Sequence, residues 1–422
     1  MSKVWINGKQ IEAESTRKLI DVLRNDCHLK SVKDGCSEGA CGSCTVIIDG
    51  RAVKACVQTM GKMEGKHVLT VEGLTDYEKK VFVYSFGEAG AVQCGFCIPG
   101  MVMCAKALLD SDPQPDRIQI AKAIRNNICR CTGYKKIIDA ISMAAAIFRG
   151  ELVLPIESGD VHVGVNCHRI DVRDKVLGQG EFVDDMEIPG MIYASAVRSP
   201  YPRARILAIH TEKARALPGV VTVLTAEDIP GSHVVGHLVH DWNVLIGPGE
   251  VTHFLGDAIC LVIAETESIL EKAKTLIHIE YEELPVVLTV EQALAEDAPK
   301  LHENGNIVSH QHMVRGNVEQ ALAEAAFVVQ KHFETPWTEH AYMEPECSIA
   351  MPYKDGVFIY SSDQGVYSIR DECALMLGLE QDKVIVENRL VGGGFGGRED
   401  AVVQPLVGLA AYRTGRIVKV KF

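Results

Sequence analysis

The chain has 422 residues, of which 47% are hydrophobic, and this is enough apolar material for several domains with buried cores. Its formal net charge of −13 argues against binding to nucleic acid, which requires a basic surface. No apolar run approaches the roughly eighteen residues of a membrane-spanning helix, and no apolar signal core follows Met1. We therefore expect a cytoplasmic protein with neither a membrane nor a nucleic acid as partner.

Residues 1–75 have the pattern of a small α+β domain. Tight hairpins are expected around residues 7–9 and 49–50, because Asn-Gly and Asp-Gly favour two-residue turns. A helix is expected between them, with Leu19, Val22 and Leu23 on its apolar side.

This domain contains four cysteines in the plant-type spacing for a 2Fe-2S cluster, C-x4-C-x2-C followed by a more distant cysteine. They are Cys36, Cys41, Cys44 and Cys56. Structural zinc also binds four thiolates. The interleaved glycines favour iron, because they let backbone N–H groups approach the sulfur atoms.

Residues 76–150 change to helical periodicity and predict a four-helix bundle. Apolar residues recur at helical spacing around 101–108, 118–124 and 137–145. A second cysteine set lies in the turns before two of these helices, where a helix N-terminus favours a thiolate: Cys94, Cys97, Cys129 and Cys131. Zinc remains an alternative for this set. The other cysteines are expected only to pack: Cys27, Cys104, Cys167, Cys260, Cys347 and Cys373.

A linker is expected over residues 151–172, and mixed α/β patterns follow it. In residues 173–295 we expect strands over 191–197, 220–224 and 277–281 and a helix over 269–276. A further domain is expected over residues 310–422, with strands at 326–329 and 384–386. The fold class is therefore multidomain α+β.

A run of glycines interrupted by Phe395 spans residues 392–397. It fits the G-x-G-x-x-G dinucleotide pattern, but the acidic residue expected about twenty positions later is missing. Consecutive glycines also let backbone N–H groups approach an anion or an oxo group closely. The alternative is a tight turn between a strand and a helix.

Several polar residues near this run have both a functional and a structural interpretation. Glu399 could bind a ligand or simply face the dipole at a helix start. Glu344 and Glu346 resemble a carboxylate pair, although such residues are more often solvated loop positions. His233, His237 and His240 have helical spacing for metal ligands, but Gly236 and the nearby valines argue against a helix.

Together these residues resemble the molybdenum hydroxylase family of xanthine dehydrogenases and aldehyde oxidoreductases, over essentially the whole chain. The segments around the two cysteine sets resemble the family most specifically, at residues 35–42 and 129–134. Further likeness lies at residues 178–185, 339–344 and 392–399. The resemblance implies a β-grasp ferredoxin domain, a helical 2Fe-2S domain, an α/β hammerhead domain and part of a molybdopterin-binding domain.

The resemblance also implies the chemistry and the cofactors. These are two 2Fe-2S clusters and molybdopterin, in a hydroxylase that takes oxygen from water and sends electrons through the clusters. Phe395, Gly394 and Gly396 match the segment that approaches molybdenum, and Glu399 matches the residue that binds a purine such as xanthine. The stretch before Cys94 is similar to a selenium-dependent xanthine dehydrogenase branch without an FAD domain.

Electrons would then pass to a separate flavoprotein or carrier. Thr338 stands where many members have a glutamine near molybdenum. Family members are about twice as long, so we expect the general base beyond Phe422 and another chain supplying the rest of the molybdenum domain. Two alternatives stay open: a non-catalytic electron-transfer subunit, and an aldehyde oxidoreductase in which Glu399 is incidental.

Overall fold

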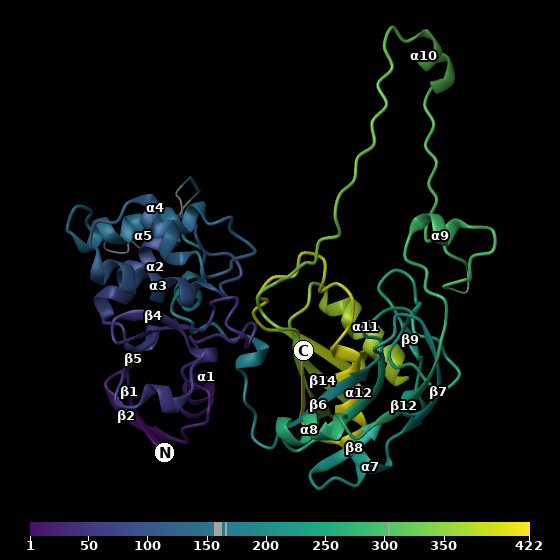
Figure 1. Cartoon of the computed structure of the whole chain (residues 1–422), viewed down its shortest axis with the longest axis horizontal. Coiled ribbons are helices and arrows are strands. Elements are labelled where there is room, and N and C mark those ends of the chain that lie inside the picture. Colours follow the sequence, from purple (N-terminus) through teal and green to yellow (C-terminus); the bar gives the residue numbers. More distant parts are fainter. Residues whose placement is uncertain (156–162, 165–166, 303) are drawn as a thin grey trace.

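The computed structural model describes residues 1–155, 163–164, 167–302 and 304–422. Residues 1–150 form one lobe and the segments after residue 180 form a second lobe beside it (Figure 1). The linker expected over residues 151–172 lies partly outside the described residues. Among the described residues, no helix is both long enough and apolar enough to cross a bilayer.

The first lobe begins with a five-stranded sheet in the order β2-β1-β5-β3-β4. Its strands are β1 (Ser2–Ile6), β2 (Lys9–Ala13), β3 (Thr45–Ile48), β4 (Arg51–Lys54) and β5 (His67–Leu69). Both expected hairpins form, and their turns place Asn7, Gly8, Asp49 and Gly50 at positive φ. The short helix α1 (Leu19–Asp21) continues as a π-helical turn (Val22–Asp26) and buries Leu23 in the core.

Four helices complete this lobe: α2 (Asp76–Glu88), α3 (Ile98–Ser111), α4 (Arg117–Ile124) and α5 (Lys135–Phe148). Thr75 and Glu78 form a capping box at the start of α2, and Asp116 and Gln119 form one at α4. The apolar faces of these helices share one buried cluster. The expected helical bundle is confirmed.

The second lobe is built around a seven-stranded sheet in the order β15-β14-β13-β16-β6-β11-β8. Its strands are β6 (Ile192–Arg198), β8 (Val220–Leu224), β11 (Ala258–Ala264), β13 (Cys347–Tyr353), β14 (Gly356–Ser361), β15 (Val384–Asn388) and β16 (Val418–Lys421). β16 lies parallel to β6 and antiparallel to β13. One sheet thus unites the segments before and after residue 300.

Two helices, α11 (Val366–Leu377) and α12 (Gln404–Thr414), share the buried cluster of this sheet. α6 (Val172–Val176) instead packs in the buried cluster of the first lobe. α9 (Val290–Leu294) and α10 (Val318–Glu324) bury none of their residues. The remaining elements are β7 (Ala204–His210), α7 (Glu212–Arg215), β9 (Val234–Val235), β10 (Trp242–Asn243), α8 (Glu267–Lys274) and β12 (His278–Glu283). The strand expected at residues 326–329 is wrong, because no neighbouring strand lies beside this segment in the described residues.

A buried charged network joins the two lobes. Arg24 of the first lobe pairs with Asp184 and Asp185, and Lys33 lies 2.5 Å from Asp185. Lys421, on the central strand β16, pairs with Asp184 at 3.0 Å. Burial acts to raise the pKa of Asp184, but Lys421, Lys419 and Arg24 outweigh it and the pKa lies below its usual value. The network fixes the first lobe against the seven-stranded sheet.

Candidate cofactor sites

The first cysteine set lies on the loop before β3 and just after β4. Cys41, Cys44 and Cys56 are buried, and Cys36 is half-buried. The four side chains interact as two pairs, Cys36 with Cys41 and Cys44 with Cys56. Two irons that each take two thiolates fit this arrangement, whereas a single zinc ion would need all four sulfurs around one point.

Backbone N–H groups in this loop point at sulfur. The N–H of Cys41 donates to Sγ of Cys36 over 3.4 Å. Burial acts to raise the pKa of the Cys36 thiol, but the N–H groups of Cys41 and two neighbouring residues outweigh it and the pKa is lowered. The same donors would stabilise the negative charge of a bound cluster. Gly42 is required here, because a Cβ on it would lie 2.4 Å from the carbonyl oxygen of Asn126.

The second cysteine set lies where the sequence places it, in the turns before α3 and α5. Cys97 is the N-cap residue of α3, and Tyr134, in the left-handed region at φ 68°, is that of α5. The side chains again pair across the two turns, Cys94 with Cys131 and Cys97 with Cys129, although Cys129 also contacts Cys131. The four sulfurs of this set thus lie in contact with one another across the two turns.

The second set carries its own donors. Thr132 Oγ1 donates to Sγ of Cys129 over 3.1 Å. Among the described residues, no three or more Cys, His, Asp or Glu side chains are gathered to hold one metal ion.

Direct hydrogen bonds connect the two cysteine loops. The N–H of Ile128 donates to the carbonyl oxygen of Cys41 over 2.7 Å, next to Cys129 in the chain. Asn127 donates its side-chain amide to the carbonyl oxygen of Gly42 over 2.9 Å. An electron on one set can therefore reach the other through a short path of covalent and hydrogen bonds.

The glycine run lies between β15 and α12, with Gly393, Phe395 and Gly396 at positive φ. A Cβ on Gly394 would lie 2.2 Å from the side-chain oxygen of Gln364, so a larger residue there would displace the Gln364 side chain. Gln364 also accepts the N–H of Gly396 over 2.9 Å. The contacts with Gln364 thus fix the conformation of this turn, and the Phe395 side chain remains half exposed.

A buried ion pair supports this turn from the inside. Arg398 donates to Oε2 of Glu344 over 2.6 Å, and both side chains are almost fully buried. The same carboxylate oxygen accepts the N–H of Gly392 over 2.7 Å, and Arg398 also donates to the hydroxyl and carbonyl oxygens of Ser362. Burial raises the pKa of Glu344 to about 7, against the opposing effect of Arg398. The expectation that Glu344 is a solvated loop residue is wrong.

Sequence reasoning missed Arg398, Gln364 and Ser362. Charged and polar side chains near a glycine run are normally exposed, so nothing in the pattern marked these three as partners of the turn. An arginine directly after the glycines was the one available signal.

Glu399 lies in a turn and its side chain is exposed. The expected helix start is wrong at this position, because α12 begins only at Gln404. His233, His237 and His240 do not lie on a helix, because β9 and loops occupy this region. Cys167 is exposed rather than packed.

A cavity of about 640 Å³ opens beside the glycine run. Its lining comes from both lobes: Gly35, Trp242, Glu339, His340, Tyr342, Pro345, Glu346, Gly396, Gly397, Asp400, Val402 and Phe422. Gly35 precedes Cys36, so the first cysteine set borders the cavity. Arg130, between two cysteines of the second set, donates to the carbonyl oxygens of Glu339 and His340 over 2.8 and 2.9 Å.

This cavity is large enough for a cofactor, and Gly35 of the first cysteine loop lines it. The second cysteine loop reaches it only through the hydrogen bonds of Arg130 to Glu339 and His340. Gly396 lines it, and Gly394 and Phe395 belong to the same turn. Asp400 lines it as well, whereas its neighbour Glu399 does not.

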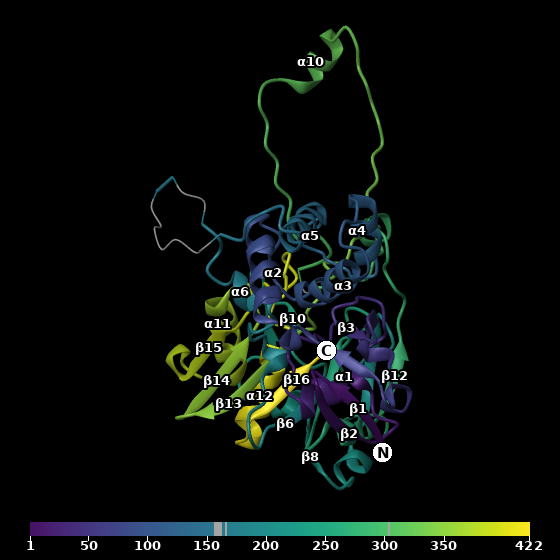
Figure 2. The same ribbon diagram turned by 90° about the vertical axis from the view of Figure 1, so that its left-hand side faces the viewer.

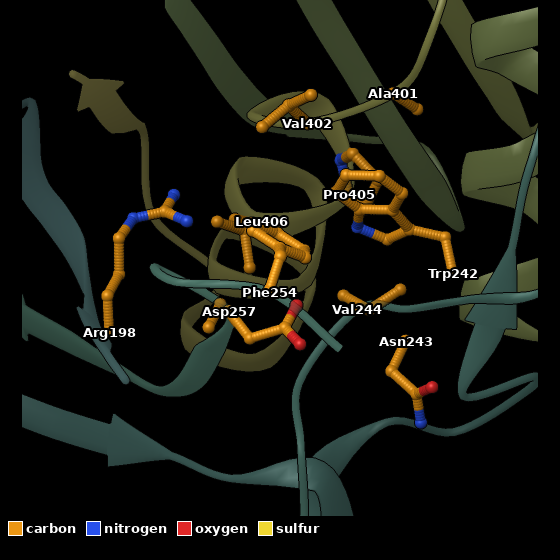
Figure 3. A pocket seen from close by; sticks show the side chains of 11 residues that line it. Arg198, Trp242, Asn243, Val244, Phe254, Asp257, Ala401, Val402, Pro405 and Leu406 are labelled. Atoms are coloured by element: carbon orange, nitrogen blue, oxygen red, sulfur yellow. The ribbon is translucent and has the colours of Figure 1, made fainter. Parts of the chain in front are cut away.

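A second cavity shares Trp242 and Val402 with the first but holds only about 20 Å³, roughly one water molecule (Figure 3). Arg198 and Asp257 lie on one side of it and Trp242 on the other. It is far too small for a substrate.

The fold and the two cysteine sets define an iron–sulfur protein. Models of four known domain families match consecutive parts of the chain. They are a 2Fe-2S iron-sulfur cluster binding domain (3–81), a 2Fe-2S binding domain (70–142), the hammerhead domain of aldehyde oxidase and xanthine dehydrogenase (177–285), and a molybdopterin cofactor-binding domain (301–422). The chain therefore has two 2Fe-2S domains, a hammerhead domain and part of a molybdopterin domain.

Individual relatives agree with this organisation. The chain is 31% identical to an aldehyde oxidoreductase of Megalodesulfovibrio gigas, over 99% of this chain and 49% of that protein. It is 45% identical to the nicotinate dehydrogenase small FeS subunit of Eubacterium barkeri, over 34% of this chain and 96% of that subunit. It is 37% identical to the xanthine dehydrogenase molybdenum-binding subunit of Escherichia coli, over 59% of this chain and 34% of that subunit.

A solved aldehyde oxidoreductase from Desulfovibrio gigas matches the structure with a TM-score of 0.94 at 30% identity, over 100% of this chain and 49% of that one. The chain belongs to the molybdenum hydroxylase family of xanthine dehydrogenases and aldehyde oxidoreductases. It spans about half the length of the aldehyde oxidoreductases that it matches.

Proposed function

We propose that this chain is the iron–sulfur and partial molybdopterin-binding portion of a molybdenum hydroxylase. The observation that carries the proposal is that the two cysteine loops hydrogen-bond to each other and both lie next to the cavity beside the glycine run. Gly35 lines that cavity, and Arg130 donates to the carbonyl oxygens of two lining residues. In this proposal Cys36, Cys41, Cys44 and Cys56 hold one 2Fe-2S cluster, and Cys94, Cys97, Cys129 and Cys131 hold the other. For the domains we propose the boundaries expected from the sequence, which are 1–75, 76–150, 173–295 and 310–422, with a linker over 151–172.

The chain's own residues have three roles. Gly394, Phe395 and Gly396 would present the turn to the cofactor, and the Glu344–Arg398 pair holds that turn in shape. The bound molybdenum cofactor would supply a two-electron oxidation that uses oxygen from water. Cys41 and Cys129, joined through Ile128, would carry the electrons away one at a time.

The test is anaerobic purification followed by metal analysis and paramagnetic resonance. We expect about four irons and four acid-labile sulfides per chain, as two 2Fe-2S clusters require, with two distinct signals after reduction. Zinc in place of iron, or no paramagnetic signal after reduction, would refute the proposal.

For the substrate we propose a purine such as xanthine. The support is Glu399, an exposed carboxylate next to Asp400 at the cavity, because a carboxylate can accept a hydrogen bond from a ring N–H. In a completed holoenzyme, Glu399→Ala should then remove purine oxidation. The matched change at another exposed acid, Glu380→Ala, should not.

An aldehyde is the second candidate, and the whole-length likeness to an aldehyde oxidoreductase favours it. Aldehyde turnover that is unaffected by Glu399→Ala would select this candidate. A non-catalytic electron-transfer subunit is the remaining alternative, and cluster signals in a complex that oxidises neither substrate would favour it.

For partners we propose a separate flavoprotein or carrier as electron acceptor, and a chain that supplies the rest of the molybdenum domain. The likeness to a separate small FeS subunit supports a multi-chain enzyme. We also propose a cytoplasmic location and a labile selenium ligand. Active holoenzyme without cyanide-labile selenium would remove the selenium assignment.

A further inference from the structure

The segment that follows the helical bundle turns back onto the second cysteine set. We call residues 168–177 the covering segment; the matched 2Fe-2S binding domain ends before it, at residue 142. Its helix α6 lies beside α2 and also contacts α3 (Figure 2). The buried cluster of the bundle includes Cys97 and three residues of the covering segment, Val172, Val176 and Leu177. The covering segment is therefore packed into the first lobe.

Lys175 of α6 packs directly on the loop that carries Cys94. Gly95, in the left-handed region at φ 94°, is so close that a Cβ on it would lie 2.6 Å from Cγ of Lys175. Nζ of the same lysine donates to the carbonyl oxygen of Gln93 over 3.0 Å. Lys175 thus contacts the residues on both sides of Cys94, and it is only 7% exposed.

Arg169 holds the same loop from the solvent side. Its guanidinium donates to the carbonyl oxygens of Val92 and Gln93 over 3.3 and 3.0 Å, and its side chain is 41% exposed. Asp171 pairs with Arg169 and lies 2.9 Å from Nζ of Lys175. Two cations and one carboxylate leave one net positive charge beside the Cys94 loop.

A positive charge next to an iron–sulfur cluster favours its reduced form. Reduction adds one electron to the cluster, and a nearby cation stabilises the added negative charge. Water screens this attraction, so it should be strong for the buried Lys175 and weaker for the exposed Arg169.

We propose that Lys175, assisted by Arg169, is a positioning residue that fixes the Cys94 loop and raises the reduction potential of the second 2Fe-2S cluster. The step concerned is a one-electron reduction in which no bond forms or breaks. The inference rests on the proposed function. It adds that a segment outside the matched cluster domain sets how readily this cluster accepts an electron.

The test is a reductive titration of the full 422-residue chain with both clusters, followed by paramagnetic resonance with dithionite as the electron donor. The signal that persists in Cys41→Ser identifies the second cluster. Lys175→Gln keeps a hydrogen-bond donor but removes the charge. We expect it to make reduction of the second cluster about tenfold less favourable, a downward shift of about 59 mV for one electron.

Three further variants separate charge from structure. Lys175→Arg keeps the cation and should restore the potential. Arg169→Gln should lower the potential by a smaller amount than Lys175→Gln. Lys62→Gln is the matched control, because Lys62 is an exposed lysine outside the helical bundle, and both potentials should stay unchanged.

Three results would each overturn the inference: a shift smaller than about threefold in Lys175→Gln, an equal shift in Lys62→Gln, or a potential in Lys175→Arg as low as that in Lys175→Gln. If Lys175→Gln loses iron, Arg169→Gln decides. A lowered potential there supports the inference, and an unchanged one overturns it. Absence of both signals from the unaltered chain would refute the proposed function too, whereas normal signals with unshifted potentials refute only this inference.

Discussion

The two cysteine sets and the glycine run differ in how much of each site this chain provides. Around the cysteines, thiolates, backbone donors and supporting glycines all come from the same lobe, and most of the sulfurs are buried. Around the glycine run, the inner support is buried, but the cavity opens to solvent, and Glu339 and His340, which line it, are exposed. This chain therefore provides the complete surroundings of the two cysteine sets, whereas it encloses the cavity beside the glycine run only in part.

Removing a cysteine tests the completeness of the first kind of site and should have the largest effect. We expect Cys41→Ser to lower the iron content by about two per chain, because one thiolate pair loses a ligand. The second cluster's signal should persist. Cys104→Ser is the control, since Cys104 is buried but hydrogen-bonds to Asn127 and pairs with no other cysteine. Iron loss in the control instead would contradict the ligand assignment.

Breaking the buried ion pair tests the inner support of the glycine run. Above about pH 7, where the Glu344 carboxyl is ionised, Arg398→Met leaves it buried without its cation, which should lower the free energy of unfolding by about 3–5 kcal/mol. Arg398→Lys keeps the charge but loses the bifurcated donor, so it should cost less. The measurement is denaturant unfolding of the second lobe. Equal stability of the two variants would show that the pair does not support the turn.

The pH dependence of stability also tests the buried Glu344 carboxyl that supports the glycine run. The folded protein holds a proton on Glu344 up to about pH 7, whereas the group's ordinary pKa is 4.5. Protonation therefore stabilises the folded state, and this contribution is lost as pH rises from 4.5 to about 7. Glu344→Gln should flatten this part of the curve of melting temperature against pH. An unchanged slope would place the titration elsewhere.

Arg130 joins the two kinds of site, and its removal should have the smallest effect. Arg130→Gln loses two hydrogen bonds to carbonyl oxygens on an exposed surface, worth about 1 kcal/mol. Hydrogen exchange at residues 339–342 should become faster while iron content stays the same. Loss of iron would show that Arg130 shapes the cluster site itself.

Local chemistry explains which features could be predicted from the sequence. The hairpins at Asn7-Gly8 and Asp49-Gly50 and the cysteine spacings depend on residues close together in the chain, so their patterns were sufficient. Glu344 and Arg398 are 54 residues apart, and only the folded sheet brings them into contact. The failed strand at residues 326–329 has the right side chains but no neighbour in the described residues to complete a ladder.

The position of β16 has a consequence for biosynthesis. This strand lies at the centre of the seven-stranded sheet, where Val418 is paired with Ile192. At ordinary translation speeds, β6 would wait roughly ten to forty seconds on the ribosome before its neighbour is made. During that time β6 lacks its neighbour on one side, and β13 lacks the same neighbour once it has been made, so nascent chains should depend on chaperones most strongly in this interval.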